Sequence, residues 1–232
     1  MIRVEDFKYK EAVLKITAEA DLFEKIRERF TYYYDRVEEY CSKRPEFMYS
    51  LEPLRVDKGV EEIIRRMAEA GSMAGVGPMA AVAGGIAQMT VEEIVEEYGP
   101  DKLIIENGGD IVLFSRDEVF VRLFCGNPKY DRLALRVRPE GRILSVCSSS
   151  GKIGHSLSFG EADISTVIAS DGFIADAFAT GIGNLCKKGT MLKRRLGEIA
   201  EIDQIYSVFV IFRERVFIAG LPPEMVSIKD NG

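Results

Sequence analysis

The stretch "DISTVIASDGFIADAFATGIGNLC", residues 163–186, decides the fold because its pattern changes in the middle. The first part, "DISTVIAS" (163–170), is a short apolar run with β-branched residues and predicts a strand. The second part, "DGFIADAFATGIGNLC" (171–186), consists almost entirely of apolar and small residues and predicts a helix. A helix with so few polar residues must be largely buried.

Asp176 is the only charged residue between Gly172 and Cys186. A buried carboxylate costs several kcal/mol unless something pairs with it. Thr180 and Asn184 follow at four and eight residues and so share its helix face. Carboxylate, hydroxyl and amide oxygens suit Mg²⁺, but an arginine or lysine elsewhere in the chain would satisfy Asp176 equally well. The helix alone leaves both interpretations open.

Upstream of this stretch the pattern is mostly helical. One strand is expected around Phe7–Ala18. Apolar residues then recur every three or four positions from Leu22 to Tyr40, which predicts one long amphipathic helix. The segment "KRPEFMYSLEPL" ends it, a second short helix is expected around residues 60–67, and a third runs from Pro78 towards Tyr98.

Downstream of Gly99-Pro100 the pattern becomes that of strands. "KLIIENGGDIVLFS" and "EVFVRLFCG" predict strands, and "DRLALRVRPEGRILSVC" predicts a hairpin that turns at residues 139–141. After the Asp176 helix, "LKRRLGEIAEI" predicts another helix, and "IYSVFVIF" with "VFIAGL" predicts a closing hairpin. Antiparallel hairpins interleaved with paired helices predict an α+β fold.

The composition is that of an ordinary soluble globular protein, with 47% hydrophobic and 29% charged residues among 232. A net charge of −6 argues against a nucleic-acid partner. The four cysteines have no metal-like spacing and no signal peptide precedes them, so we expect reduced thiols in the cytoplasm. The uncharged run 71–91 is rich in alanine and broken by Pro78, so we expect it inside protein and not in a membrane.

Two glycine pairs admit functional and structural interpretations. "NGGD", residues 107–110, lies between two strand patterns, where paired glycines allow positive φ and a close ligand, or simply a turn. Gly84-Gly85 lies inside a helical pattern, where each glycine costs roughly 1 kcal/mol, so a close backbone approach is expected. Tight packing of two helices would explain that pair without a ligand.

The segment "SSSGKIGHSLSFG" (148–160) contains His155, the only histidine in the chain. An imidazole there suits proton transfer or phosphate contact, although a loop histidine is often just solvated. The backbone at Gly151 and the neighbouring serines can hydrogen-bond an anion. The serines of this segment are Ser148, Ser149, Ser150, Ser156 and Ser158.

Four segments taken together resemble the ApbE-like superfamily, and most closely an uncharacterised prokaryotic branch called ApbE-related. They are "AGGIAQ" (83–88), "IENGGDI" (105–111), "SSSGKIGHSLSFG" (148–160) and "TVIASDGFIADAFATGIG" (166–183). The resemblance implies two T-fold-like modules of antiparallel sheet with packed helices, here residues 1–125 and 126–232. It also implies a Mg²⁺-dependent flavin transferase that cuts FAD and attaches FMN to a threonine of an acceptor protein.

The resemblance implies roles for individual residues of this chain. The resemblance implies that Asp176, Thr180 and the carbonyl of Ala87 bind Mg²⁺. It implies that Asn107, Gly108 and Gly109 line the flavin nucleotide, and that His155 is the catalytic histidine. Two departures occur: "HSLSFG" is shorter than the family's "HIIDPRTG", and Gln88 stands where the family has lysine.

The sequence therefore supports three alternative functions. The first is a Mg²⁺-dependent enzyme that binds FAD or FMN, with flavin transfer as its sharpest form. The second is a sulfur-handling accessory protein in which Cys147 carries a persulfide, against the simpler interpretation of a buried strand thiol. The third is a flavin-binding module without catalysis. For the first, we expect Asp176 to be buried facing residues 148–160, and His155 to lie within about 10 Å of it.

Overall fold

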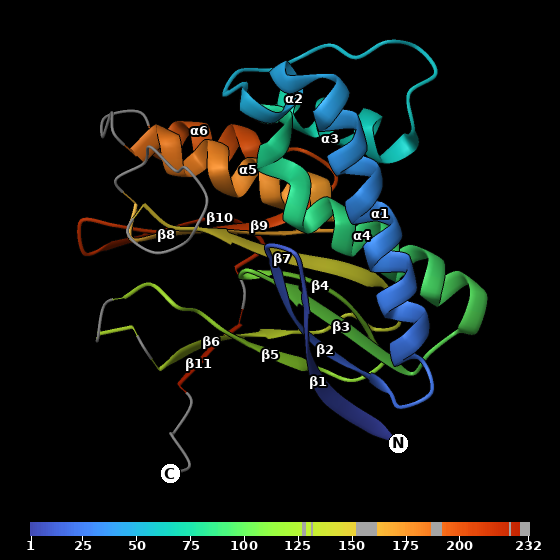
Figure 1. The fold of residues 1–232 in the computed structure, drawn as a ribbon. Helices are drawn as coiled ribbons and strands as arrows, with labels where there is room; N and C mark the ends of the chain where they lie inside the picture. Colours follow the sequence, from blue (N-terminus) through green and yellow to red (C-terminus); the bar gives the residue numbers. More distant parts are fainter. Residues whose placement is uncertain (127–128, 131, 152–161, 187–191, 223, 228–232) are drawn as a thin grey trace.

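The computed structural model describes residues 1–126, 129–130, 132–151, 162–186, 192–222 and 224–227. Three layers are stacked: helices, a large sheet, and a small sheet on the face opposite the helices (Figure 1). The large sheet has eight strands in the order β1-β2-β3-β4-β7-β8-β9-β10, and the small one has the order β11-β6-β5. All neighbouring strands are antiparallel. The expected α+β fold is confirmed.

The elements have the following bounds. The strands of the large sheet are β1 (Ile2–Tyr9), β2 (Ala12–Glu19), β3 (Lys102–Asn107), β4 (Asp110–Ser115), β7 (Ile143–Ser149), β8 (Ile164–Ala169), β9 (Ile205–Phe212) and β10 (Arg215–Gly220). Those of the small sheet are β5 (Val119–Arg122), β6 (Leu133–Val137) and β11 (Glu224–Ser227). The helices are α1 (Phe23–Lys43), α2 (Pro45–Tyr49), α3 (Glu62–Ala74), α4 (Val82–Tyr98), α5 (Gly172–Leu185) and α6 (Leu192–Ile199), and a 3-10 turn, η1 (Pro78–Ala81), precedes α4.

The opening stretch folds as its pattern predicts, with β8 leading into α5. All six residues of β8 are buried, because helices cover one face of the large sheet and the small sheet covers the other. Asp171 precedes α5, and its carboxylate accepts hydrogen bonds from the backbone N–H groups of Phe173 and Ile174 and so caps the helix. The long helix α1 and the β9–β10 hairpin also match their predictions.

Three sequence predictions need correction. The single strand expected at Phe7–Ala18 is a hairpin of β1 and β2. Its turn at Lys10 has φ +49° and contains no glycine, proline or asparagine to signal it. Lys10 is held there by ion pairs to Asp35 (2.7 Å) and Glu38 (2.5 Å) on α1.

The prediction of a hairpin that turns at residues 139–141 is also wrong. A turn exists there, with Glu140 and Gly141 at positive φ, but it carries the chain from β6 in the small sheet to β7 in the large sheet. The reason is burial: the apolar residues of β6 pack onto the large sheet from outside instead of extending it. The third correction is smaller, since the segment expected only to end α1 contains the short helix α2.

The order strand–strand–helices–strand–strand occurs twice along the chain. β1 and β2, helices α1 to α4, and β3 and β4 form the first series, and β7 and β8, α5 and α6, and β9 and β10 form the second. Within each series the strands lie in chain order in the sheet. The expected division at residues 125 and 126 lies between β5 and β6 and stays a prediction.

α4 and α5 cross at contact distance, which explains the Gly84-Gly85 pair. A Cβ atom on Gly84 would collide with the carbonyl oxygen of Gly172 and lie 2.8 Å from Cβ of Asp176. A Cβ atom on Gly85 would lie 2.5 Å from the ring of Phe173. Close helix packing is therefore sufficient to account for both glycines.

In the described part of the chain, no single helix has the length and apolarity needed to cross a bilayer. The pair Glu62–Ala74 and Pro78–Tyr98 passes a combined test of length and composition, but the two are bent by 105° at the break between them. Within the uncharged run 71–91, residues 72, 73 and 75 are exposed and the others are buried or half-buried inside the protein.

Candidate functional site

The polar face predicted on α5 lines a cavity. Asp176, Thr180 and Asn184 all border a space of about 220 Å³ between α5, the start of α4 and the segment that follows α2. Asp110, the first residue of β4, borders the same space. Because the three α5 residues are four apart, one helix face delivers all of them to one wall.

Asp176 is buried without a cationic partner in the described residues. Only 8% of its surface is exposed, and the backbone N–H of Gly84 donates to its Oδ2 at 2.9 Å. No ion pair between described residues involves Asp176, so the alternative of an arginine or lysine partner is not found among them. Burial, and secondarily the nearby carboxylate of Asp110, raise the pKa of Asp176 well above its usual range.

Asp110 is the site residue that the sequence reasoning missed. It is 8% exposed, and the backbone N–H of Ser148 donates to its Oδ1 at 3.2 Å. Burial raises its pKa to about 7. The signal that could have found it is strand alternation, because Asp110 shares the helix-facing side of β4 with Val112, which belongs to the main core.

The glycine pair at 108–109 forms a two-residue turn between β3 and β4. Gly108 has φ +65° and Gly109 has φ +104°, and Asn107 pairs directly with Asp110 across the turn. Such double positive φ values are the reason for two glycines at a tight hairpin. The Asn107 side-chain amide donates to the carbonyl oxygen of Ala83 at 3.3 Å, which ties the turn to the start of α4.

A larger apolar cavity adjoins the acidic one. It has a volume of about 630 Å³ and lies between α1, α2, α4 and the β3–β4 turn. Asn107 and Tyr34 line it, and Glu11 and Glu38 are the acidic residues in its wall. The two cavities share four lining residues, Met48, Met79, Val82 and Ala83, so they are neighbours.

The serine-glycine segment is described only up to Gly151. Ser149 ends β7, buried beside its partner Ser165. Ser150 donates its hydroxyl to the carbonyl of Asp163 at 2.8 Å, and the N–H of Gly151 donates to the carbonyl of Ala162 at 3.1 Å. None of Ser149, Ser150 and Gly151 is among the described residues lining either cavity.

The remaining residues of this segment, His155 and Ser156, lie outside the described residues. The expected 10 Å separation of His155 from Asp176, and the expected approach of the whole segment to Asp176, therefore stay predictions.

Ala87 and Gln88 lie one helical turn beyond Ala83, the last residue of α4 that borders the acidic cavity. Ala87 is fully buried and is not among the cavity-lining residues, so its carbonyl as a metal ligand stays a prediction without support from the lining. The Gln88 side chain accepts from the N–H of Gly172 (2.8 Å) and from the hydroxyl of Ser145 (3.1 Å). Its role is to join α4 to the start of α5.

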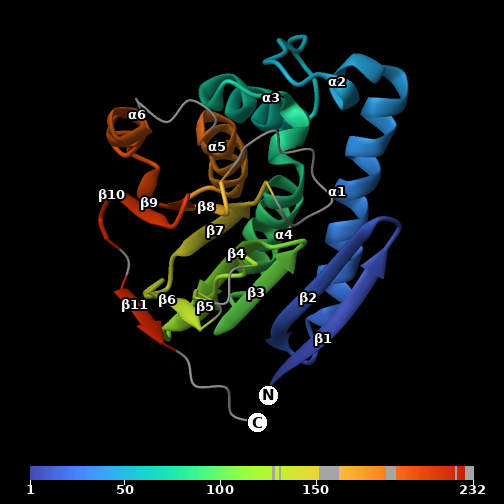
Figure 2. The ribbon, with the colours of Figure 1, turned by 90° about the vertical axis from the view of Figure 1, so that its left-hand side faces the viewer.

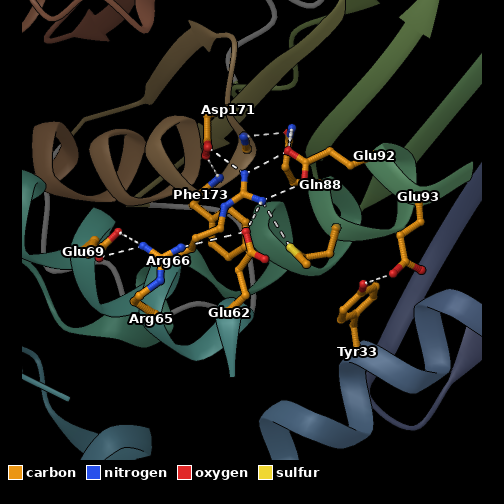
Figure 3. Close-up of polar contacts among 12 residues, drawn as sticks. Tyr33, Glu62, Arg65, Arg66, Glu69, Gln88, Glu92, Glu93, Asp171 and Phe173 are labelled. Carbon is orange, nitrogen blue, oxygen red and sulfur yellow. Dashed lines mark hydrogen bonds and ion pairs between the residues drawn. The ribbon is translucent and has the colours of Figure 1, made fainter. Parts of the chain in front are cut away.

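Gln88 also belongs to a wider polar network around Arg66 (Figure 3). Its amide donates to Glu92 at 2.8 Å, and Arg66 pairs with Glu92 (2.6 Å) and with the α5 cap Asp171 (2.8 Å). The Arg66 guanidinium lies 4.4 Å from the ring centre of Phe173. This network joins α3, α4 and the start of α5.

Cys147 lies beside the acidic pair but has no exposed surface. Burial raises the pKa of its thiol well above the usual range, and the carboxylates of Asp110 and Asp176 raise it further. A protonated, inaccessible thiol is a poor nucleophile. The geometry therefore favours the interpretation of Cys147 as a strand thiol over that of a persulfide carrier.

The thiol interpretation gives a simple prediction. Because all four cysteines are buried, the native protein is expected to react with a thiol reagent such as DTNB at least ~100-fold more slowly than the protein in denaturant. Absorbance at the reagent's release wavelength measures both rates. One cysteine reacting rapidly in the native protein, and lost in Cys147→Ala, would restore the sulfur hypothesis.

Comparisons with known proteins give consistent results. A family model described as AbpE bacteria matches residues 4–203. A UPF0280 protein of Archaeoglobus fulgidus is 38% identical over 226 residues, which cover 97% of this chain and 91% of the relative. A UPF0280 protein of Methanocaldococcus jannaschii is 41% identical over 196 residues, which cover 82% and 79%.

Solved structures share the fold at low sequence identity. The flavin transferase ApbE from Vibrio cholerae aligns with a TM-score of 0.59 and 10% identity, covering 94% of this chain and 97% of that one. The ApbE protein from Thermotoga maritima aligns with a TM-score of 0.62 and 9% identity, with coverage of 94% and 97%.

Proposed function

The chain belongs to the family described as AbpE bacteria, and from this premise and the two adjoining cavities we propose that it binds a flavin nucleotide together with a divalent cation. The apolar cavity would take the flavin ring. The acidic cavity would take the cation and the phosphates that it binds.

One observation carries this proposal. Asp110 and Asp176 are two buried carboxylates in one cavity wall, and their known partners are backbone N–H groups and the thiol of Cys147. Two buried like charges without a cation destabilise a fold, so such a pair is kept where it serves a ligand. Hard oxygen donors fit Mg²⁺, which commonly takes one or two protein carboxylates and completes its shell with phosphate and water.

Each residue has a distinct role in the proposal. Asp110 and Asp176 would hold the ion, with the hydroxyl of Thr180 beside them and the amide of Asn184 able to donate to a phosphate oxygen. When bound, Mg²⁺ neutralises charge on the phosphates. The N–H of Gly84 and the N–H of Ser148 fix the two carboxylates in orientation.

The volume and character of the second cavity agree with a ring ligand. About 630 Å³ lies within the usual range for small-molecule sites, and its wall is mostly apolar with Tyr34 and Met48 among its residues. The shared lining residues let one ligand extend from the apolar cavity into the acidic one.

Flavin transfer is the most specific version of the proposed function. In that reaction an acceptor hydroxyl attacks the phosphorus of the FMN part of FAD, the bond to the AMP phosphate breaks, and AMP leaves. His155 would take the proton of the hydroxyl. A non-catalytic flavin-binding module is the alternative, and AMP release from FAD with Mg²⁺ distinguishes the two.

We place this activity in the cytoplasm as part of the proposal, and fractionation of expressing cells tests that location.

A direct test separates the two cavities. Riboflavin has the ring but no phosphate, so it is expected to bind equally with Mg²⁺ and with EDTA. FMN is expected to bind at least ~10-fold more tightly with Mg²⁺, because its phosphate would otherwise face two carboxylates. Quenching of flavin fluorescence measures all four affinities.

A matched variant assigns each result to its cavity. Ser42→Trp places a large ring at the wall of the apolar cavity from an exposed position and is expected to weaken riboflavin and FMN alike. If neither flavin binds the wild-type protein, the proposal fails. If FMN binds with the same affinity in EDTA, the cation part alone fails.

A further inference from the structure

The two outer edges of the large sheet differ in character. β1 and β10 lie at opposite ends of the sheet (Figure 2). The β1 sequence, "IRVEDFKY", has charged residues at four of its eight positions, whereas the β10 sequence, "RVFIAG", has only Arg215 at its start. Charged residues on an edge strand prevent unwanted pairing, so β1 is protected and β10 is not.

β10 also exposes apolar side chains. Val216 is 42% exposed and Ile218 is 39% exposed, both on the face away from the helices, and Leu221 just beyond is 72% exposed. β9 pairs with one side of β10, and no strand among the described residues pairs with the other. A regular apolar edge with free N–H and C=O groups is a template for another strand.

We propose that β10 pairs antiparallel with β10 of a second copy of the chain, which joins two eight-stranded sheets across a two-fold axis. Facing residues in such a pair lie on the same side of the sheet. With Phe217 on the axis, Val216 faces Ile218 of the second copy, and with Ile218 on the axis, the two Ile218 side chains meet. In both registers the central residues are apolar on both strands, whereas Arg215 faces Ala219 in the first register and Leu221 in the second, and the two Arg215 residues lie at opposite ends.

α6 gives an independent reason for a second copy as the occupant. This helix packs over β10 on the helix side of the sheet, at the same end of the molecule (Figure 2). Its first half carries Lys193, Arg194 and Arg195, of which Arg194 (3.0 Å) and Arg195 (2.7 Å) pair with Glu198 of the same helix, and Glu201 follows just beyond the helix. A two-fold axis at β10 sets the two α6 helices antiparallel, so Lys193 of one copy is on the side of Glu201 of the other.

The oligomeric state tests the proposal directly. The purified wild-type protein is expected to run as a dimer in size-exclusion chromatography with light scattering. Ile218→Lys is expected to weaken self-association at least ~100-fold and to give a monomer, because it places a charge in the centre of the apolar pair. Val4→Lys is the matched control, since Val4 is an exposed apolar residue of the other edge strand, and it is expected to leave the dimer intact.

A second measurement decides the case if Ile218→Lys fails to fold. Phe217→Cys and Ile218→Cys each add one thiol, which lies on the axis in one of the two registers, and the four native cysteines are buried and give little background. One of the two variants is expected to form a disulfide-linked dimer on mild oxidation, and Val4→Cys is not. A wild-type monomer, a dimer that Ile218→Lys does not weaken, or β10 paired with a foreign strand would each overturn the proposal.

Discussion

Asp176→Asn is expected to remove Mg²⁺-dependent nucleotide binding and at the same time to stabilise the metal-free protein. Asparagine keeps an oxygen that accepts from the N–H of Gly84 but carries no charge. Loss of a carboxylate ligand is expected to weaken Mg²⁺ binding by at least ~100-fold. Because burial raises the pKa of Asp176, the folded metal-free protein must either protonate this carboxyl or bear a buried charge, and asparagine removes that cost; the free energy of unfolding is expected to rise by about 2 kcal/mol, or about 4–8 °C in Tm.

Calorimetric titration with Mg²⁺ and FMN, and thermal melting in EDTA, measure the two effects. Asp171→Asn is the matched control, because Asp171 is an aspartate of the same segment that pairs with Arg66 at 2.8 Å. Its substitution is expected to lower Tm and to spare Mg²⁺ binding. A lower Tm for Asp176→Asn, or unchanged Mg²⁺ affinity, would contradict the proposed cation site.

The same pair predicts how stability changes with pH. The folded-state pKa of Asp110, about 7, lies above the usual aspartate value of 3.8, so the folded protein holds this proton more tightly than the unfolded chain. The stabilisation is therefore complete below the unfolded value and is lost as the pH rises through about 7. In EDTA, wild-type stability should fall between pH 5 and 7.5, by at least about 1–3 kcal/mol, and Asp110→Asn should reduce this slope, leaving the part that comes from Asp176.

Gly84→Ala is expected to be strongly destabilising. The added Cβ would collide with the carbonyl oxygen of Gly172 and with Cβ of Asp176, so α4 and α5 would have to separate. Overpacking at a backbone-to-backbone contact, together with loss of the Gly84–Asp176 hydrogen bond, is expected to cost about 3–5 kcal/mol. Chemical denaturation measures this loss, and flavin binding should weaken with it.

Gly197→Ala in α6 provides the control with the opposite sign. A Cβ on Gly197 meets nothing within 4 Å, and alanine has the higher helix propensity. This variant is expected to gain about 0.5–1 kcal/mol. Equal effects at residues 84 and 197 would mean that the helix crossing is not the tight contact described above.

The part of the site on α5 could be predicted because one periodicity determined it. Asp176, Thr180 and Asn184 are four residues apart in a helix with no other charge, so their common face followed from the sequence alone. The helices and the closing hairpin were predictable for the same reason, since each has a clear period and a clear end. The family resemblance added the ligand class, which no spacing supplies.

The missed features depend on contacts between distant segments. Asp110 looks like an ordinary turn residue until β4 and α5 meet in space. The turn at Lys10 contains none of the residues that usually signal a turn. Ion pairs to Asp35 and Glu38 on α1 stabilise it instead, and these contacts cannot be read from the local sequence. Whether β6 pairs with β7 depends on which sheet face is left uncovered, and no local pattern records that. For Gln88, the sequence showed only an absent lysine, whereas its contacts show a joint between α4 and α5.

The two acidic residues come from different series of the repeated element order, Asp110 from the first and Asp176 from the second. During synthesis on the ribosome, Asp110 emerges long before Asp176 and stays hydrated and ionised until α5 docks. Their repulsion therefore arises only when α5 docks beside β4. A divalent cation available to the nascent chain would favour that step, so magnesium supply would affect the yield of folded protein as well as its ligand binding.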